Sequence, residues 1–339
     1  MKILKREIKQ CLSCMEKHEV HIVEMLETSI FKNEKIEFLA QYEFCSNANE
    51  TFENETMMRI NNLSLKDAYR QKMRLLTSQE IISIREKYDI SQKDFSEILE
   101  WGQKTITRYE NHQVQDRAHD DILRKIDNDP QWFLDLLERS HNNLSEKAFL
   151  QYKKSANHEL KRSKNIYLMN VIKSQYVDYA DEMITGYTKL NLNKVIEMVN
   201  YFTLKIDQVH KVKLMKLLWY ADFLNFKLYS VGISGLVYQI ETFGALPICH
   251  EEIIDLDGIK YEYVQYNYEQ IGYRFITYDN FKINELSKNE VKVIDSVINQ
   301  LGHLSGKEIA ERMHQENAYL HSTKNQLISY KYAKDLSIN

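Results

Sequence analysis

Glycine and proline are the residues this sequence has least of, with nine glycines and two prolines in 339 residues. Both residues interrupt helices and shape tight turns, so their scarcity predicts few turns and much helix. The chain is too long for one small domain, and its length predicts two or three. Apolar residues make up 43% of the sequence, and its aromatic residues include 22 tyrosines, which is enough to build sizeable cores.

The sequence also lacks the long apolar runs that are typical of membrane spans and secretion signals. No run approaches the roughly 18 apolar residues that cross a bilayer, and residues 1–20 lack the apolar segment of a signal peptide. The cysteines therefore indicate the reducing cytoplasm and not a disulfide framework. The net charge of −4 excludes a generally basic nucleic-acid coat protein, so any contact with DNA must be local. We expect a cytoplasmic protein with no membrane partner.

Residues 76–115 have the pattern of three short helices. Ser78 is placed to cap the first helix, and Ser91 to cap the second. A turn is predicted at Gly102, because glycine tolerates a positive φ, and the third helix is predicted over residues 103–110. Two short helices joined by a turn that contains glycine form the helix-turn-helix geometry that fits the DNA major groove. The alternative is a generic helical bundle in which Gly102 only ends a helix.

This segment, "LTSQEIISIREKYDISQKDFSEILEWGQKTITRYENHQVQ", resembles the Xre/Cro class of helix-turn-helix domains, and within it those of MqsA-type antitoxins. The resemblance implies contacts with the backbone and bases of double-stranded DNA. The residues expected to make them are Gln92, Gln103, Lys104, Thr105, Thr107 and Arg108. Acidic residues balance the basic ones in this segment, so non-specific affinity should be modest in a monomer. A homodimer on one DNA operator is therefore expected.

The N-terminal module begins with Cys11 and Cys14, whose two-residue spacer is typical of a zinc knuckle. The stretches "EVHIVEML" and "EKIEFLAQYEF" alternate apolar and polar residues as two strands do. Cys45 ends the second stretch, but Ala48 stands where a fourth cysteine would follow. The module resembles the zinc ribbon of MqsA-type antitoxins in a degenerate form. The expected ligands are Cys11, Cys14, Cys45 and His18, with His21 as the weaker histidine candidate. The alternative is a ribbon that its strands hold together without metal, and no cofactor other than zinc is expected.

Residues 53–76 and 141–190 are helical in pattern, with Ser64 or Asn62 as the expected cap of the first stretch. The second stretch reads as a charged linker, and its basic run is typical of a solvated helix face. Beyond it, "LNKVIEMVNYFTLK" and "VHKVKLMKLLWYADFLNFKLY" predict two amphipathic helices. "LVYQIETFGALP" predicts a short strand that runs into a loop, and the tyrosine-rich residues 259–281 predict two antiparallel strands. A further helix is expected to begin at Ser287, with Glu290 completing a capping box.

Residues 193–335 resemble the Panacea (SocA-like) antitoxin domain. The resemblance rests on "KLMKLLWYADFLNFK", "GISGLVYQIETFGALP" and "LSGKEIAERMHQENAYLHSTKNQLISYKYA". The second stretch departs from the family, which usually carries Gly-Pro-x-Pro where this chain has Gly-Ala-Leu-Pro. Membership implies a domain that binds and neutralises a protein toxin without catalysis. Tyr220, Tyr238 and Tyr319 are the aromatic residues expected to be exposed as anchors for that partner, although aromatics at helical spacing are more often core.

Taken together, the patterns predict a mainly α protein with smaller β elements (α+β). The expected division is a degenerate zinc ribbon at 1–62, a helix-turn-helix domain at 63–140, a charged linker at 141–190, and a mostly helical domain with a small antiparallel sheet at 191–339. No nucleophile, metal set or phosphate loop indicates an enzyme; the adjacent Cys249 and His250 are the nearest approach to a nucleophile and base.

The expected function is that of a type II antitoxin, which neutralises a cognate toxin and represses its own operon. The alternatives are a phage or mobile-element regulator whose C-terminal domain senses another protein, and an adaptor for proteolysis.

Overall fold

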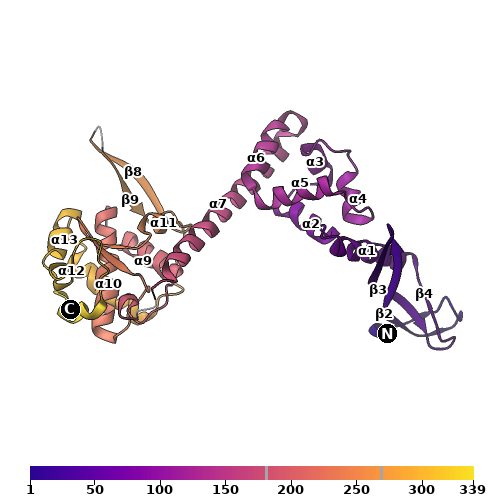
Figure 1. Ribbon diagram of the computed structural model, residues 1–339, viewed down its shortest axis with the longest axis horizontal. Helices are drawn as coiled ribbons and strands as arrows, with labels where there is room; N and C mark the ends of the chain where they lie inside the picture. Colours follow the sequence, from indigo (N-terminus) through magenta and orange to yellow (C-terminus); the bar gives the residue numbers. More distant parts are fainter. Residues whose placement is uncertain (180–181, 268–269) are drawn as a thin grey trace. The chain divides into compact units, whose positions relative to one another are not determined.

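The structure, a computed structural model, describes residues 1–179, 182–267 and 270–339. The chain forms two compact units, Met1–Leu160 and Lys161–Asn339 (Figure 1). Helix predominates over strand, and the sheets are small and antiparallel, which confirms the predicted α+β class. Within the described ranges, no helix is both long enough and apolar enough to span a membrane.

The first unit begins with a four-stranded antiparallel sheet in the order β1-β2-β3-β4. Its strands are β1 (Lys2–Gln10), β2 (Lys17–Phe31), β3 (Glu34–Cys45) and β4 (Glu50–Phe52). Lys32 and Asn33 both have positive φ and form the two-residue turn between β2 and β3, a geometry that matches the twist of the strands. The two strands predicted from alternating residues are both present, within β2 and β3.

Helix α1 (Glu55–Lys72) covers the part of the β3 edge that β4 leaves unpaired. The side-chain amide of Asn61 accepts from the backbone N–H of Gln41 at 2.7 Å and donates to its carbonyl at 2.8 Å. Ser64 donates to the carbonyl of Leu39 at 2.7 Å. The helix predicted to be capped by Asn62 or Ser64 therefore begins earlier, at a cap made by Asn54, and the division drawn at residue 62 falls inside it.

Five short helices follow and enclose a hydrophobic core of their own. They are α2 (Ser78–Lys87), α3 (Gln92–Ile98), α4 (Thr105–Asn111), α5 (Arg117–Asn128) and α6 (Pro130–Arg139). The cap of α2 is Thr77, in a capping box with Glu80, and not Ser78 as predicted. Ser78 instead donates its hydroxyl and its backbone N–H to the carboxylate of Asp67 on α1, at 2.5 and 2.8 Å.

The long helix α7 (Glu146–Tyr176) contains the boundary between the two units, and each part of it packs within its own unit. Phe149 and Tyr152 belong to the core formed by α2–α6, whereas Leu168, Ile172 and Tyr176 belong to the core of the second unit. The helical character predicted for residues 141–190 is thus largely present. The buried residues on α7 show that this segment is more than a solvated linker.

The second unit is built around α10 (Lys211–Tyr229), in which every residue from Lys213 to Asn225 is buried. Helices α9 (Leu192–Lys205), α12 (Lys288–Leu301) and α13 (Gly306–Met313) contact it, and α12 has the predicted capping box of Ser287 and Glu290. The remaining short helices of this unit are α8 (Glu182–Thr185), α11 (His250–Ile254), α14 (Asn317–Leu320) and the 3-10 turn Tyr330–Asp335; a second 3-10 turn, His141–Asn143, lies in the first unit.

Two small sheets complete this unit. The tyrosine-rich segment forms β8 (Lys260–Asn267) and β9 (Gln270–Ile276) as predicted, with β5 (Val209–His210) on the far side of β9. Residues 268–269, between the two strands, lie outside the described residues. The segment predicted as one strand and a loop is instead a hairpin of β6 (Tyr238–Glu241) and β7 (Gly244–Pro247), joined by a two-residue turn.

Candidate functional site

Four metal-ligating side chains meet at one end of the N-terminal sheet. Cys11 and Cys14 lie in the turn between β1 and β2, His18 lies at the start of β2, and Cys45 ends β3. Their ligand atoms all lie within 4.8 Å of one another, and the Sγ of Cys45 is 3.5 Å from the Nε2 of His18. Register brings them together, because the pairing of β2 with β3 places Cys45 beside the first residues of β2.

The backbone around Cys11 stabilises its thiolate, whereas burial raises the pKa of the Cys14 thiol. Burial raises the pKa of the Cys11 thiol, but the backbone N–H groups of Cys14 and Ser13 outweigh it, so that the pKa is lowered overall. At the other end of the cluster, the N–H of Ala48 donates to the Sγ of Cys45 at 3.3 Å. The turn after Cys45 therefore keeps the shape of a knuckle although alanine replaces its second cysteine.

Histidine supplies the donor that the missing cysteine would have given. His18 faces Cys45, whereas His21 bonds to the carboxylate of Glu19 at 2.8 Å and lies outside the cluster. Three thiols and one imidazole are a ligand set that Zn²⁺ accepts in four-coordinate structural sites. Zn–S bonds of about 2.3 Å place tetrahedral ligands within about 4 Å of one another, close to the spacing seen here. The residues present fit a structural zinc ion.

Helices α3 and α4 carry the residues predicted to contact DNA. Helix α3 ends at Ile98, and the positive φ of the following turn falls on Glu100 and not on Gly102. Helix α4 begins at Thr105, two residues later than predicted, so Gln103 and Lys104 lie in the turn. The predicted order of helix, turn and helix is retained, with boundaries shifted by a few residues.

The predicted DNA-contacting residues differ in how freely they can reach a ligand. Gln103, Lys104 and Arg108 are exposed, whereas Thr105, Thr107 and Gln92 are half-buried. The amide of Gln92 donates to Glu110 at 2.5 Å and accepts from the hydroxyl of Thr107 at 2.8 Å, and these bonds tie α3 to α4.

Sequence reasoning missed the acidic residue that fixes this arrangement. Glu110 is 4% exposed and also accepts from the Nε of Arg85 at 2.6 Å. A buried carboxylate between an arginine and a glutamine holds both side chains in fixed positions. The sequence signal that could have identified Glu110 is a charged residue on the side of the helix that its apolar residues predict to be buried.

In the second unit, two of the three predicted aromatic anchors lie inside the core. Tyr220 and Tyr238 are 0% exposed, so the prediction that they are surface residues is wrong. Their hydroxyls donate to Glu316 at 3.0 Å and to Asp222 at 2.6 Å, and they are buried because helices and the β6–β7 hairpin surround α10. Tyr319 is half-buried and stacks on the ring of His314, with centroids 4.3 Å apart.

Buried polar residues on α10 hold the loops around it. The carboxyl of Asp222, 0% exposed, accepts from the backbone N–H groups of Ile233 and Ser234 at 2.7 and 2.8 Å, and from the hydroxyl of Tyr238. Burial raises its pKa. Lys216, also 0% exposed, donates to the carbonyl of Ala245 on β7. These contacts tie β7 and the loop after α10 to the helix.

The pair formed by Cys249 and His250 has the wrong electrostatics for a nucleophile and base. Burial raises the pKa of the Cys249 thiol, and the charge of Glu252 raises it further. Burial and the nearby Lys211 lower the pKa of His250. A reactive thiolate with an imidazolium partner needs both shifts in the opposite direction.

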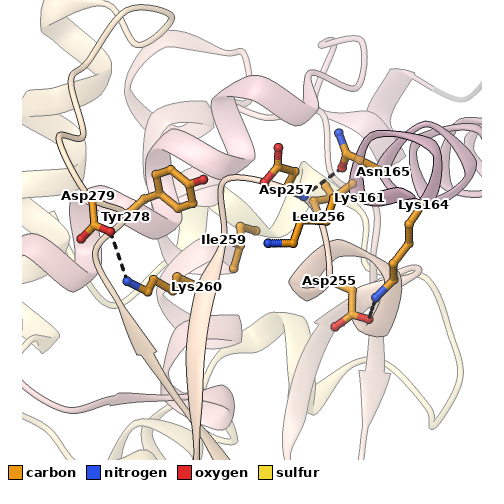
Figure 2. Close-up of a pocket in the computed structure, with 10 residues that line it drawn as sticks. All are labelled: Lys161, Lys164, Asn165, Asp255, Leu256, Asp257, Ile259, Lys260, Tyr278 and Asp279. Atoms are coloured by element: carbon orange, nitrogen blue, oxygen red, sulfur yellow. Dashed lines mark hydrogen bonds and ion pairs between the residues drawn. The ribbon is translucent and has the colours of Figure 1, made fainter. Parts of the chain in front are cut away.

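A polar pocket of about 390 Å³ lies between α7, α11 and β8 in the second unit (Figure 2). Its charged groups are largely paired across the walls: Lys164 with Asp255 at 3.0 Å, and Lys260 with Asp279 at 3.3 Å. Asn165 accepts from the backbone N–H of Asp257 at 2.9 Å. The arrangement ties α7 to the loop after α11, and the residues drawn there form no nucleophile–base pair.

Comparison with known families identifies part of the second unit. Residues 214–319 match the family described as "Antitoxin SocA-like, Panacea domain". This range runs from α10 to α14, so the resemblance stated for the C-terminal region is confirmed there. No curated protein and no solved structure matches the chain.

Proposed function

We propose that this chain is the antitoxin of a type II toxin–antitoxin pair. Its second unit neutralises a cognate protein toxin by direct binding and steric occlusion, and its helix-turn-helix represses the operon that encodes both proteins. The observation that carries this proposal is the match of residues 214–319 to an antitoxin domain.

The DNA-binding half of the proposal rests on α3, α4 and the turn between them. Lys104 and Arg108 are exposed and can reach phosphates, while the exposed Gln103 can reach base edges. The bond network through Gln92 and Glu110 keeps the two helices in fixed orientation. Two copies, bound to half-sites about one helical turn apart, would supply the affinity that one weakly charged copy lacks.

The cluster of Cys11, Cys14, His18 and Cys45 is proposed to hold one zinc ion. The ion would join the β1–β2 turn to the end of β3 and neutralise the thiolates. Its role is structural, because four protein ligands fill a tetrahedral coordination sphere and leave no open position.

Neutralisation is tested by expressing the adjacent small gene in a naive host, with and without this chain. Growth arrest that this chain relieves, together with a stable complex of the two purified proteins, is the expected result. A harmless neighbour that forms no complex would overturn the antitoxin proposal. Faster loss of the bound partner in cells that make this chain would indicate an adaptor for proteolysis instead.

Repression is tested by gel retardation of the operon's promoter DNA. Changing Lys104 and Arg108 together to alanine should abolish retardation while leaving thermal unfolding nearly unchanged, because both side chains are exposed. The matched control changes Lys35 and Arg139, an exposed lysine and arginine elsewhere in the same unit. Retardation that survives the first double change, or that the control abolishes equally, would contradict the assignment of this surface.

A further inference from the structure

An apolar groove of about 600 Å³ opens between the start of α10, the turn of the β6–β7 hairpin and α13. Apolar surface dominates its lining. Val212 on α10 and Phe243 in the hairpin turn form two of its sides, Gly306 and Ala310 lie along α13, and His314 follows the end of that helix. The volume lies within the range of about 300–1,000 Å³ typical of binding pockets.

The aromatic ring of Phe243 contributes little to the stability of the fold, because most of it is exposed to solvent. The side chain is 65% exposed and occupies one of two positions in the tight turn between β6 and β7. Val212 on the opposite side is 37% exposed. A two-residue turn usually carries small or polar residues, so an exposed phenylalanine beside an apolar groove has the character of a binding surface.

Gly306 lines the floor of the groove and adds no side chain to it. A Cβ at this position would lie 3.7 Å from the Cβ of Val212, an ordinary contact, and its φ lies outside the region that favours glycine. Neither backbone strain nor crowding therefore requires glycine there. Ala310 follows one turn later on the same face of α13, which lengthens the open floor.

The rim of the groove is polar. Lys307 and Glu311 lie one turn apart on α13, with their charged atoms 3.9 Å from each other and side chains 86% and 60% exposed. Such an open ion pair is weak, and its members can pair with a protein partner at little cost. An apolar centre with a charged rim is the anatomy of a protein–protein interface.

We propose that this groove is where the second unit seats the toxin, by taking an aromatic or long aliphatic side chain of the toxin between Phe243 and α13. The inference rests on the proposed function and adds the surface and the chemistry of recognition. The choice of a toxin as occupant follows from the family match, since Phe243, Gly306 and Ala310 all fall within residues 214–319.

The test uses the full chain and the purified product of the adjacent small gene, with affinity measured by calorimetry. Gly306→Leu fills the floor, and Phe243→Ala removes the side wall; each should weaken binding at least about tenfold, as expected for residues at an anchoring pocket. The controls are Gly306→Ala, which leaves the groove open, and Tyr263→Ala, which removes another aromatic ring, 69% exposed, from the same unit. Both controls should bind like the original chain.

The outcomes separate this inference from the function on which it rests. If the original chain binds the neighbouring protein and Gly306→Leu and Phe243→Ala bind equally well, the groove is not the docking site although the antitoxin function stands. If the original chain does not bind at all, the proposed function fails and the groove has no toxin to seat. If both groove variants lose self-association in sedimentation experiments but keep the toxin, the groove seats a second copy, which overturns the inference.

Discussion

Replacing the buried Lys216 by methionine tests the energetics of the core of the second unit. Lys216 is 0% exposed, and its Nζ donates a hydrogen bond of 2.8 Å to the carbonyl oxygen of Ala245. Burial lowers the pKa of this amine from 10.5 to about 7. Because the unfolded chain keeps the ordinary pKa, the unfolded state binds more protons than the folded state between these two values. The free energy of unfolding therefore rises with pH across this window.

The magnitude follows from the same two pKa values. At 1.36 kcal/mol for each pKa unit, burying the charged amine costs about 5 kcal/mol below pH 7. About 2 kcal/mol of this cost disappears between about pH 7 and pH 9, and almost none changes below about pH 6, where Lys216 is protonated in both states. Methionine has a similar length and no charge, so Lys216→Met should remove this part of the pH dependence. Loss of the hydrogen bond to Ala245 lowers the free energy of unfolding by the same amount at both pH values, so it does not affect the comparison.

Urea unfolding of both proteins, at two pH values and equal ionic strength, measures the effect. The expected result is a free energy of unfolding that rises by about 2 kcal/mol more in the original chain than in Lys216→Met between about pH 7 and pH 9. Groups that titrate elsewhere cancel in this comparison, because they are present in both proteins. An equal rise in the two proteins would show that the amine keeps its ordinary pKa in the folded state, and the reasoning would be refuted.

Three further changes have defined outcomes. The full chain should contain about one zinc per molecule by elemental analysis, and Cys45→Ser should lose it, whereas His21→Ala should keep it. Asp222→Asn replaces a carboxylate oxygen by an amide N–H₂ that faces the donors Ile233 and Tyr238. Urea unfolding should therefore show a free energy of unfolding that is lower by about 2–4 kcal/mol. Arg70→Met should cost about 3–5 kcal/mol, because this buried arginine bonds to Asp67 and to the backbone carbonyls of α4 and the following loop; an unchanged midpoint would contradict that.

Elements with a strong local signal could be predicted from the sequence. The capping box of Ser287 and Glu290 marks the start of α12, and two tyrosines two positions apart, Tyr261 and Tyr263, mark β8. Boundaries that depend on tertiary partners could not be placed as well. Thr77 and Ser78 are both good caps, and the choice falls on Thr77 because Asp67, from another helix, takes the hydroxyl of Ser78.

Burial on all sides of α10 was the main feature that local pattern could not show. A helix that carries Lys216 and Asp222 among apolar residues has the sequence of an amphipathic surface helix. In the structure both polar side chains find partners more than ten positions away in the chain, on β7 and in the loop at Ile233. When those partners are not known, the charges of Lys216 and Asp222 predict that this face of the helix is exposed to solvent. Tyr220 is then predicted to lie at the surface as well.

The candidate metal cluster was predicted with the right residues, and its geometry explains why the sequence left alternatives open. A lone pair of cysteines with a two-residue spacer is a weak signal, because the partners lie in other strands. The pairing of β2 with β3 decides that His18 and not His21 faces Cys45. A shift of one residue in that register would turn His18 to the opposite face of the sheet.

The outer strand β1 has a consequence for how copies of this chain meet in solution. Its other edge is unpaired, and the strand carries four cations and one carboxylate: Lys2, Lys5, Arg6, Lys9 and Glu7. Charged side chains along an edge strand hinder the approach of a second edge, so sheets from separate molecules are discouraged from joining into larger ones. Edge-to-edge joining through β1 is therefore disfavoured, and the dimer proposed for DNA binding would form through another surface.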